Sequence, residues 1–338
     1  MIKKIILGIF AFFIALLAGA FVFFQSTFPK VAPPESITVE ATPERLARGK
    51  YLAHSVAVCI DCHSTRDWQY FSGPPKPGTF GQGGELFGEE MGFPGSIYAR
   101  NITPAALSSW RDGELIRAIR NGVDKHGHGL FPIMPYPNYQ SLSKEDVYSI
   151  VAYIRTLAPV TYTPPKTKLN FPLNFIVETM PSDHDYGVMP EHSDTVAYGK
   201  YLFTVAGCSD CHTPNKKHDG PPEKDMERYL AGGFEFPVPW GMLRSTNITP
   251  DKETGIGLWT REQFVGKFKT YAPEEKKRME SKPPFDETRY NSIMPWTMYA
   301  DMTEEDLSAI YAYLQTVKPI HQKVKRYSAE GMVISQAK

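Results

Sequence analysis

The four cysteines of this chain form two pairs with the same spacing, and a histidine directly follows each pair. The residues are Cys59, Cys62 and His63, then Cys208, Cys211 and His212. In a C-x-x-C-H segment two thioether bonds hold a porphyrin and the adjacent imidazole binds its iron, as in c-type haem. One C-x-x-C pair alone would equally suit a redox dithiol or half of a zinc site. Two copies that both end in histidine predict two covalently bound haem c groups.

A low-spin electron carrier needs a second axial ligand on each iron, and methionine is the ligand that raises the reduction potential. An Ile-Met-Pro segment follows each haem motif and places Met134 in the first half and Met294 in the second. Met91, Met298 and Met302 are competitors, because an isolated methionine is usually core filler. The repeated context favours the first two. The predicted iron ligands are therefore His63, Met134, His212 and Met294.

Short segments around these motifs also occur twice, which indicates two related modules. Gly-Lys-Tyr-Leu starts at Gly49 and at Gly199, and Asn-Ile-Thr-Pro starts at Asn101 and at Asn247. The two methionines are separated by more residues than the two cysteine motifs, so the second module contains an insertion, at about residues 271–289. Its content of Lys, Glu and Pro predicts an exposed elaboration rather than core.

Helix signals flank the motifs in each module. Thr42 followed by Pro43 is typical of a helix start before the first haem motif. Ser143 and Thr303 each precede apolar residues at helical spacing and have an aspartate three residues later, which predicts a capped helix after each methionine.

Two glycines predict where helices cross. Gly49 and Gly199 have no side chain, so another helix can approach closely, and we expect the helices that hold Tyr153 and Tyr313 to do so. A solvent-facing glycine is the alternative.

The segments between each haem motif and the next Asn-Ile-Thr-Pro are rich in Gly and Pro and show no useful alternation, so we expect loops and no sheet there. Residues 159–192 contain several prolines and form the predicted connection between the modules. Its apolar residues suggest that it packs against the modules; they are Phe171, Leu173, Phe175 and Ile176.

Length and charge limit the possible functions. The 338 residues suffice for two or three domains with their own cores. The 37 basic side chains balance 37 acidic ones and form no basic stripe, so a nucleic-acid partner is not expected.

The N-terminus carries a long apolar segment. After Lys3 and Lys4, residues 5–24 include no charged side chain and can span a bilayer as a helix. A cleaved signal peptide with its cleavage site near residues 18–20 is the alternative, but the apolar run is longer than a usual signal core. An uncleaved anchor is favoured, and the two lysines place the N-terminus in the cytoplasm and the modules outside.

Each half of the chain resembles a class I bacterial cytochrome c domain. The haem motif, the Met-Pro segment and the helix around Tyr153 or Tyr313 carry the resemblance. The order of Asn-Ile-Thr-Pro, tryptophan and Met-Pro is similar to the membrane-associated cytochrome subunits of bacterial alcohol, aldehyde and gluconate dehydrogenases. Those subunits generally have three haem motifs, and this chain has two.

The predicted fold is therefore mainly α, with an N-terminal transmembrane helix followed by two tandem cytochrome c domains. The expected segments are 1–30 as membrane anchor or signal, 31–160 as first domain, 161–190 as Pro-rich interdomain linker, 191–322 as second domain and 323–338 as C-terminal tail.

The resemblance implies a membrane-anchored dihaem cytochrome that transfers electrons and is not itself a catalytic enzyme. The implied partners are a periplasmic or membrane dehydrogenase as donor, an oxidase or another cytochrome as acceptor, and the bilayer. The expected location is the bacterial cell membrane, with a single pass and the haem domains on the periplasmic side. A fixed subunit of a respiratory complex is a related possibility.

A dihaem enzyme of the peroxidase or sulfur-compound dehydrogenase type is the alternative, in which one iron is open or has a labile ligand. His126 or His128, just before Met134, could then displace that methionine.

Side chains beside the ligands are candidates for tuning the haems, although asparagine equally suits a turn cap and tryptophan equally suits the core. These candidates are Arg100, Asn101, Trp110, Asn247 and Trp259. Tyr136 and Trp296 each lie two residues after a methionine and are expected to cover the haem edge.

Overall fold

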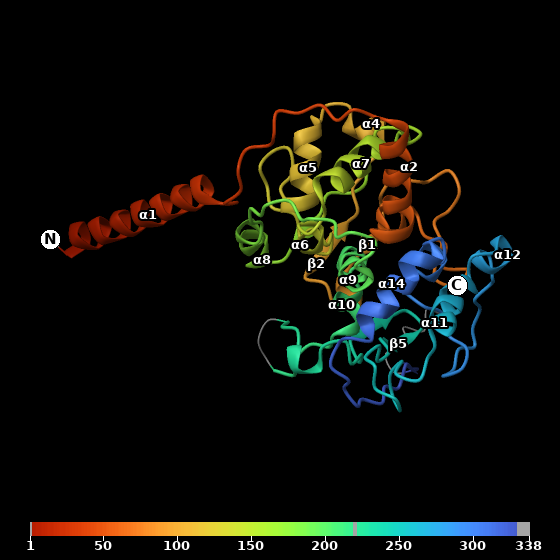
Figure 1. The fold of residues 1–338 in the computed structure, drawn as a ribbon. Helices are drawn as coiled ribbons and strands as arrows, with labels where there is room; N and C mark the ends of the chain where they lie inside the picture. The colour runs from red at the N-terminus through yellow and green to blue at the C-terminus, as the bar shows by residue number, and fades with distance from the viewer. Residues whose placement is uncertain (1, 219–221, 330–338) are drawn as a thin grey trace.

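The computed structural model describes residues 2–218 and 222–329 and has the predicted mainly helical fold with an apolar helix at the N-terminus. That helix, α1 (Ile2–Thr27), extends away from the rest of the molecule and buries none of its side chains (Figure 1). It is long and apolar enough to cross a membrane.

The helices of the first module hold the first cysteine pair and the first methionine between them. α2 (Pro43–Tyr51) begins at the predicted cap, where the Thr42 hydroxyl accepts a hydrogen bond from the Arg45 amide at 3.3 Å. The helix after Met134 is capped as predicted by Ser143. The elements after α2 are η1 (Leu52–Val56, π-helical), α3 (Cys59–Cys62), η2 (Glu89–Met91), α4 (Pro104–Leu107), α5 (Asp112–Asn121), α6 (Tyr136–Tyr139) and α7 (Lys144–Ile154).

The second module repeats the main helices in this order with one addition, and its described residues include no counterpart of η1 or α4. The predicted cap is again present, because the Thr303 hydroxyl accepts a hydrogen bond from the Asp306 amide at 3.1 Å. The added helix, α12, lies in the predicted insertion, none of whose residues is fully buried. The helices are α9 (Thr195–Val205), α10 (Cys208–His212), η4 (Met226–Arg228), α11 (Arg261–Lys269), α12 (Glu274–Lys277), α13 (Trp296–Tyr299) and α14 (Glu304–Leu314).

The two glycine crossings are confirmed. A Cβ atom at Gly49 would lie 1.9 Å from the Ser149 carbonyl oxygen in α7, and one at Gly199 would lie 1.9 Å from the Ala309 carbonyl oxygen in α14. Any side chain at either position would therefore push the crossing helices apart.

The expectation of no sheet in the Gly- and Pro-rich segments was wrong. Each module contains a small antiparallel sheet of three strands, in the orders β1-β2-β3 and β4-β5-β6. Strands of two to four residues are too short to show alternation. β1 and β2, like β4 and β5, pair locally, whereas β3 and β6 pair with strands far away in the sequence. The strands are β1 (Leu86–Phe87), β2 (Gly95–Tyr98), β3 (Lys168–Leu169), β4 (Glu235–Val238), β5 (Gly241–Arg244) and β6 (Tyr327–Ser328).

The connection between the modules does not pack through the apolar residues that the sequence suggested. Phe171, Phe175 and Ile176 are exposed, and Leu173 is only partly buried. The connection contacts the first module instead through β3 and the buried Val177. Its two short helices are α8 (Leu173–Ile176) and η3 (Val177–Thr179).

The two modules share one continuous apolar core, which contains Leu52 and Val151 from the first and Leu202 and Leu307 from the second. Each module also places a buried aspartate at the other's first helix. Tyr51 donates a hydrogen bond to the Asp306 carboxylate at 2.6 Å, and Tyr201 donates one to the Asp146 carboxylate at 2.6 Å. The pairing is reciprocal, so the modules are related by an approximate twofold axis.

Candidate functional site

The two cysteine pairs lie on short helices that begin in the same unusual way. The residue before each pair has a left-handed backbone, with φ of 45° at Val58 and 67° at Gly207. This conformation reverses the chain after the preceding helix and starts α3 and α10 at the first cysteine. Burial raises the pKa of Cys59, Cys62 and Cys208 to about 12. A redox dithiol needs a thiol whose pKa is lowered towards neutral, so this environment does not favour one.

The motif histidines are both oriented by a backbone carbonyl. His63 places Nδ1 2.7 Å from the Arg100 oxygen, and His212 places Nδ1 2.8 Å from the Thr246 oxygen. Burial also lowers the pKa of both imidazoles, which favours their neutral form. A neutral imidazole that donates from Nδ1 leaves Nε2 as a free electron-pair donor, as a ligand to iron requires. The donor set therefore fits a haem iron.

The Asn-Ile-Thr-Pro segments brace these carbonyls. Asn101 accepts a hydrogen bond from the Thr103 amide at 2.8 Å and donates to the carbonyls of Val160 and Tyr162 beyond α7. Asn247 makes the matching bonds to Thr249 and to Ile320 beyond α14. Each asparagine thus stabilises its own turn and links that turn to the end of its module. This is the turn-cap role that the sequence analysis gave as the alternative to haem tuning.

The candidate tryptophans differ in their surroundings. Trp110 is partly buried against the core, while Trp259 is 37% exposed. The core alternative therefore suits the first tryptophan, and the second lies at the surface.

The two methionine segments have the same local fold. Met134 and Met294 are partly buried at the edge of the core, and each precedes a proline and a single helical turn. The amide two residues later donates to each methionine carbonyl at 2.7 Å. The competitors Met298 and Met302 are buried in the core, at 8% and 1% exposure, as packing residues are.

The aromatic residues after the methionines have unequal environments. Tyr136 is fully buried, with 1% exposure. Trp296 packs on the rings of Phe268 and Tyr271, whose centroids lie 5.2 and 5.5 Å away. Tyr271 belongs to the insertion, so this elaboration covers the second methionine segment.

A serine from the first module holds the methionine segment of the second. The Ser72 hydroxyl donates to the Met294 carbonyl and accepts from the Trp296 amide at 3.0 Å. The Ser72 amide donates to Asn291 at 2.9 Å. Ser72 is fully buried and has a left-handed backbone, with φ of 68°. A single serine in a loop has no sequence signal, so this contact could not be predicted.

The first module also contacts the second cysteine motif. Asn138, in α6, donates to the Asp210 carboxylate at 2.6 Å. Two buried tyrosines lie in the same region, where Tyr139 donates to the Ala57 carbonyl and Tyr299 to the Ala206 carbonyl. The second cysteine motif therefore contacts the first module through Asn138.

The loop histidines lie away from this interface. His126 and His128 are exposed, and His128 places Nδ1 3.5 Å from the Glu178 carboxylate. No group of three or more potential metal ligands from His, Cys, Asp and Glu occurs within residues 2–218 and 222–329.

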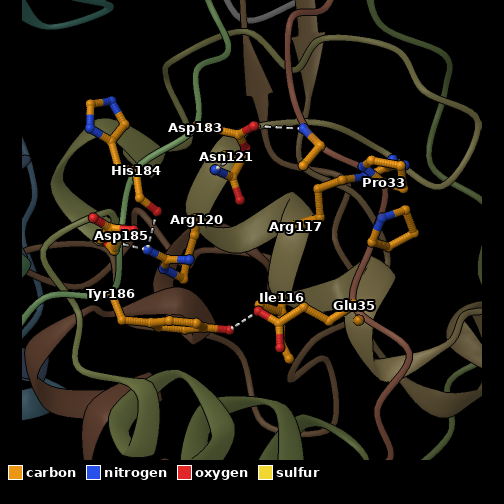
Figure 2. A pocket seen from close by; sticks show the side chains of 13 residues that line it. Pro33, Glu35, Ile116, Arg117, Arg120, Asn121, Asp183, His184, Asp185 and Tyr186 are labelled. Carbon is orange, nitrogen blue, oxygen red and sulfur yellow. Dashed lines mark hydrogen bonds between the residues drawn. The ribbon is translucent and has the colours of Figure 1, made fainter.

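A separate cavity of about 580 Å³ lies where the segment after α1 meets α5 and the interdomain connection. Figure 2 shows the Arg120 guanidinium beside the Tyr186 ring, with 3.8 Å between its central carbon and the ring centroid, and Tyr186 donating to Glu35. None of the predicted haem residues lines this cavity. Its contacts join the segment after the N-terminal helix to the body.

Comparison with known proteins places these features in a family. The cytochrome c family model matches residues 196–318, which contain the second cysteine motif and Met294. The chain is 31% identical to the fructose dehydrogenase cytochrome subunit of Gluconobacter japonicus, over 85% of this chain and 56% of that protein. It is 27% identical to the cytochrome c subunit of the quinone-dependent alcohol dehydrogenase of Gluconacetobacter polyoxogenes, over 86% of this chain and 60% of that protein.

Another relative is named as a dihaem protein. The chain is 28% identical to a diheme cytochrome c-type protein of Cereibacter sphaeroides, over 57% of this chain and 64% of that protein. All three alignments leave a third or more of the relative unmatched, and the chain spans 56–60% of the two dehydrogenase subunits. Residues 196–318 therefore form a cytochrome c domain, in a chain that is similar over most of its length to the cytochrome c subunits of bacterial dehydrogenases.

Proposed function

We propose that this chain is a dihaem c-type cytochrome that transfers electrons from a dehydrogenase towards the respiratory chain. One haem c is held by Cys59, Cys62 and His63, and the other by Cys208, Cys211 and His212. The duplicated histidine geometry carries this proposal, because each Nδ1 faces a backbone carbonyl and each Nε2 is left free. Bound haem supplies a one-electron iron couple whose potential depends on its ligands and on burial.

The residues of the chain position and tune these groups. The carbonyls of Arg100 and Thr246 fix the imidazole tautomer and ring orientation. Asn101 and Asn247 fix those carbonyls in turn, through bonds to their own turns and to the ends of the modules. Each ligand is thus held by its whole module rather than by one loop.

Met134 and Met294 would each supply the other ligand to the iron of their haem in this proposal. Replacing either by alanine is expected to give one high-spin haem of lower potential, because the sulfur ligand stabilises the reduced, low-spin iron. Electron paramagnetic resonance and redox titration of the purified holoprotein measure both changes. Met302→Leu is the matched control, since that side chain is buried in the core. An unchanged spectrum for either alanine variant removes that methionine from the ligand set.

The chain is anchored in the cell membrane by α1, with both modules on the periplasmic side. The length and apolar character of α1 and the two lysines that precede residues 5–24 support this arrangement. The names of the relatives support a dehydrogenase as donor. Co-purification after mild solubilisation, followed by identification of the bound proteins, tests whether the chain is a fixed subunit.

An electron carrier and a dihaem enzyme differ in whether one haem iron has a free or easily displaced ligand position. Optical and paramagnetic resonance spectra, recorded with and without carbon monoxide, separate them. A carrier shows two low-spin haems, a methionine-to-iron charge-transfer band and no reaction with carbon monoxide. A high-spin or carbon-monoxide-reactive haem, together with peroxidase turnover, would contradict the electron-carrier proposal and support the dihaem enzyme. The exposed positions of His126 and His128 favour the carrier.

A further inference from the structure

The interdomain connection exposes apolar side chains close to the end of α1. Phe171 is 82% exposed, and Phe175 and Ile176 in α8 are 39% and 43% exposed. Neighbouring exposed apolar side chains of this size usually mark an interaction surface. We call Phe171 together with α8 the linker patch.

Ring contacts join the linker patch to the anchor helix. The Phe175 ring centroid lies 6.4 Å from that of Phe24 in α1, and Phe24 lies 5.3 Å from Phe28. On the other side, Phe175 lies 6.3 Å from Phe171. The four rings form a continuous apolar series from the helix to the patch. Figure 1 shows α8 on the side of the body from which α1 extends.

The chain between α1 and the body is short and held at its far end. Lys30 forms a parallel bridge with Ser182, and the Ala32 amide donates to the Asp183 carboxylate at 2.7 Å. Only Phe28 and Pro29 lie between Thr27 and Lys30, so this stretch reaches about 11 Å at most. The patch therefore stays near the end of α1 wherever that helix is placed.

Charged groups near the patch suit a lipid surface. Lys30, Lys166 and Lys168 are exposed, and lysine stems can lie along apolar surface while the ammonium reaches headgroup phosphates. Two nearby carboxylates keep their charge, because Glu89 accepts from the Asn170 amide and Glu178 from the Gly129 amide, and both donors are neutral. Aromatic and lysine side chains together are typical of the membrane interface.

We propose that the linker patch is a second membrane contact, which lies in the interfacial layer of the bilayer that α1 crosses. This inference rests on the proposed role of α1 as an anchor. A helix alone leaves the body free to rotate about the connection. A second contact fixes one orientation of the two haem modules above the lipid surface.

Site-directed spin labelling of the full-length holoprotein tests the patch. Haem attachment uses all four native cysteines, so an introduced cysteine is the single reactive thiol. Phe171→Cys places a nitroxide in the patch, and Leu258→Cys, at a residue that is 71% exposed in the second module, is the matched control. Both are reconstituted in vesicles of phosphatidylethanolamine and phosphatidylglycerol. Accessibility to oxygen and to a water-soluble nickel complex is then measured.

In vesicles, the label at position 171 is expected to collide several-fold less often with the nickel complex than the label at position 258. If the two labels are equally accessible in protein that sediments with the vesicles, the second membrane contact is wrong but the anchor is not. The linker patch would then be a surface for a protein partner. Protein that stays in solution overturns both the anchor and the second contact. The haem spectra are independent of either result and test the electron-transfer proposal separately.

Discussion

Ser72 shows how one residue can connect the two modules. Its hydroxyl bridges the carbonyl and amide that flank Pro295, directly beside the proposed iron ligand Met294. The left-handed backbone at Ser72 is unfavourable for serine, and the surrounding hydrogen bonds maintain it. In the proposed dihaem protein Ser72 is therefore a positioning residue for the second haem, although it belongs to the first module.

Ser72→Ala is expected to change the second haem and leave the first unchanged. Loss of the hydroxyl removes one partner each from the Met294 carbonyl and the Trp296 amide, which still bond to each other at 2.7 Å, so the expected cost is about 0.5–1.5 kcal/mol. In a Met134→Ala background only the second haem contributes a methionine-to-iron band. Ser72→Ala should weaken that band and shift the reduction potential of the second haem. Ser72→Gly relieves the backbone but also lacks the hydroxyl, so it should show the same spectral change. A normal band in both variants would refute the positioning role.

His54 makes part of the stability of the first module depend on pH. Burial lowers its pKa to about 4, and its Nε2 lies 2.6 Å from the Tyr153 hydroxyl. The unfolded imidazole titrates near about 6.5 and so binds more protons than the folded one between these values. The stability that depends on neutral His54 is therefore fully present above the pKa of the unfolded state and is lost as the pH falls towards the folded-state pKa of about 4.

His54→Gln is therefore expected to reduce the loss of stability between neutral and mildly acidic pH. The difference from the wild type should be about 2 kcal/mol for a fall from pH 7 to pH 5. Denaturant titration of both proteins at the two pH values measures it. An identical pH dependence in the variant would show that His54 is not the group responsible.

The helix crossings are the elements whose geometry is most sensitive to a single atom. Gly49→Ala or Gly199→Ala is expected to lower the free energy of unfolding by about 2 kcal/mol or more, because the new Cβ meets a backbone carbonyl. Gly266→Ala is the matched control in α11, where a Cβ has nothing within 4 Å. There alanine should raise stability by about 0.5–1 kcal/mol. Thermal unfolding of the three variants distinguishes a crossing effect from a general effect of alanine.

Elements with local signals were predictable, and elements made by distant pairing were not. Thr42, Ser143 and Thr303 cap their helices through side chains a few residues away, so the sequence alone contains the information. β6 instead lies within the predicted C-terminal tail and pairs with β5, more than 80 residues earlier. Tyr327 is buried by that pairing, at 2% exposure, which no local pattern indicates.

The candidate sites show the same division. The cysteines, histidines and methionines follow from motifs, whereas the contacts that orient them across the modules do not. The connection packs against the first module as its apolar sequence suggests, but through β3 and Val177 and not through the side chains of the linker patch. Apolar composition indicates that a segment avoids water and does not identify the surface that covers it.

At the scale of the whole molecule, two equivalent tyrosines hold the modules together. Tyr201 donates to Asp146, which Arg48 also binds through two hydrogen bonds of 2.8 and 2.9 Å, and Tyr51 donates to Asp306. Burial raises the pKa of both tyrosines, so they remain donors at all ordinary pH values. The interface thus contains two similar charge-assisted contacts.

Tyr51→Phe and Tyr201→Phe are each expected to lower stability by about 1.5–3 kcal/mol, because a buried carboxylate loses a donor while the ring is kept. The approximate twofold relation predicts similar effects for the two changes. Denaturant unfolding measures the loss, and hydrogen exchange in α7 and α14 shows whether the interface opens. Tyr162→Phe, at an exposed position, is a suitable control. No loss in either interface variant would mean that apolar packing alone joins the modules.

The contact between Ser72 and the Met294 segment also bears on the history of the chain. A duplicated module can in principle separate again into two independent proteins. Here the Ser72 hydroxyl of the first copy donates to the Met294 carbonyl of the second, and the Phe71 amide of the first copy donates to the Met279 carbonyl in the insertion. A gene split between the modules would leave the second copy with an incomplete ligand loop. Fusion of the two copies is therefore hard to reverse by evolution, because each later contact of this kind makes separation more costly.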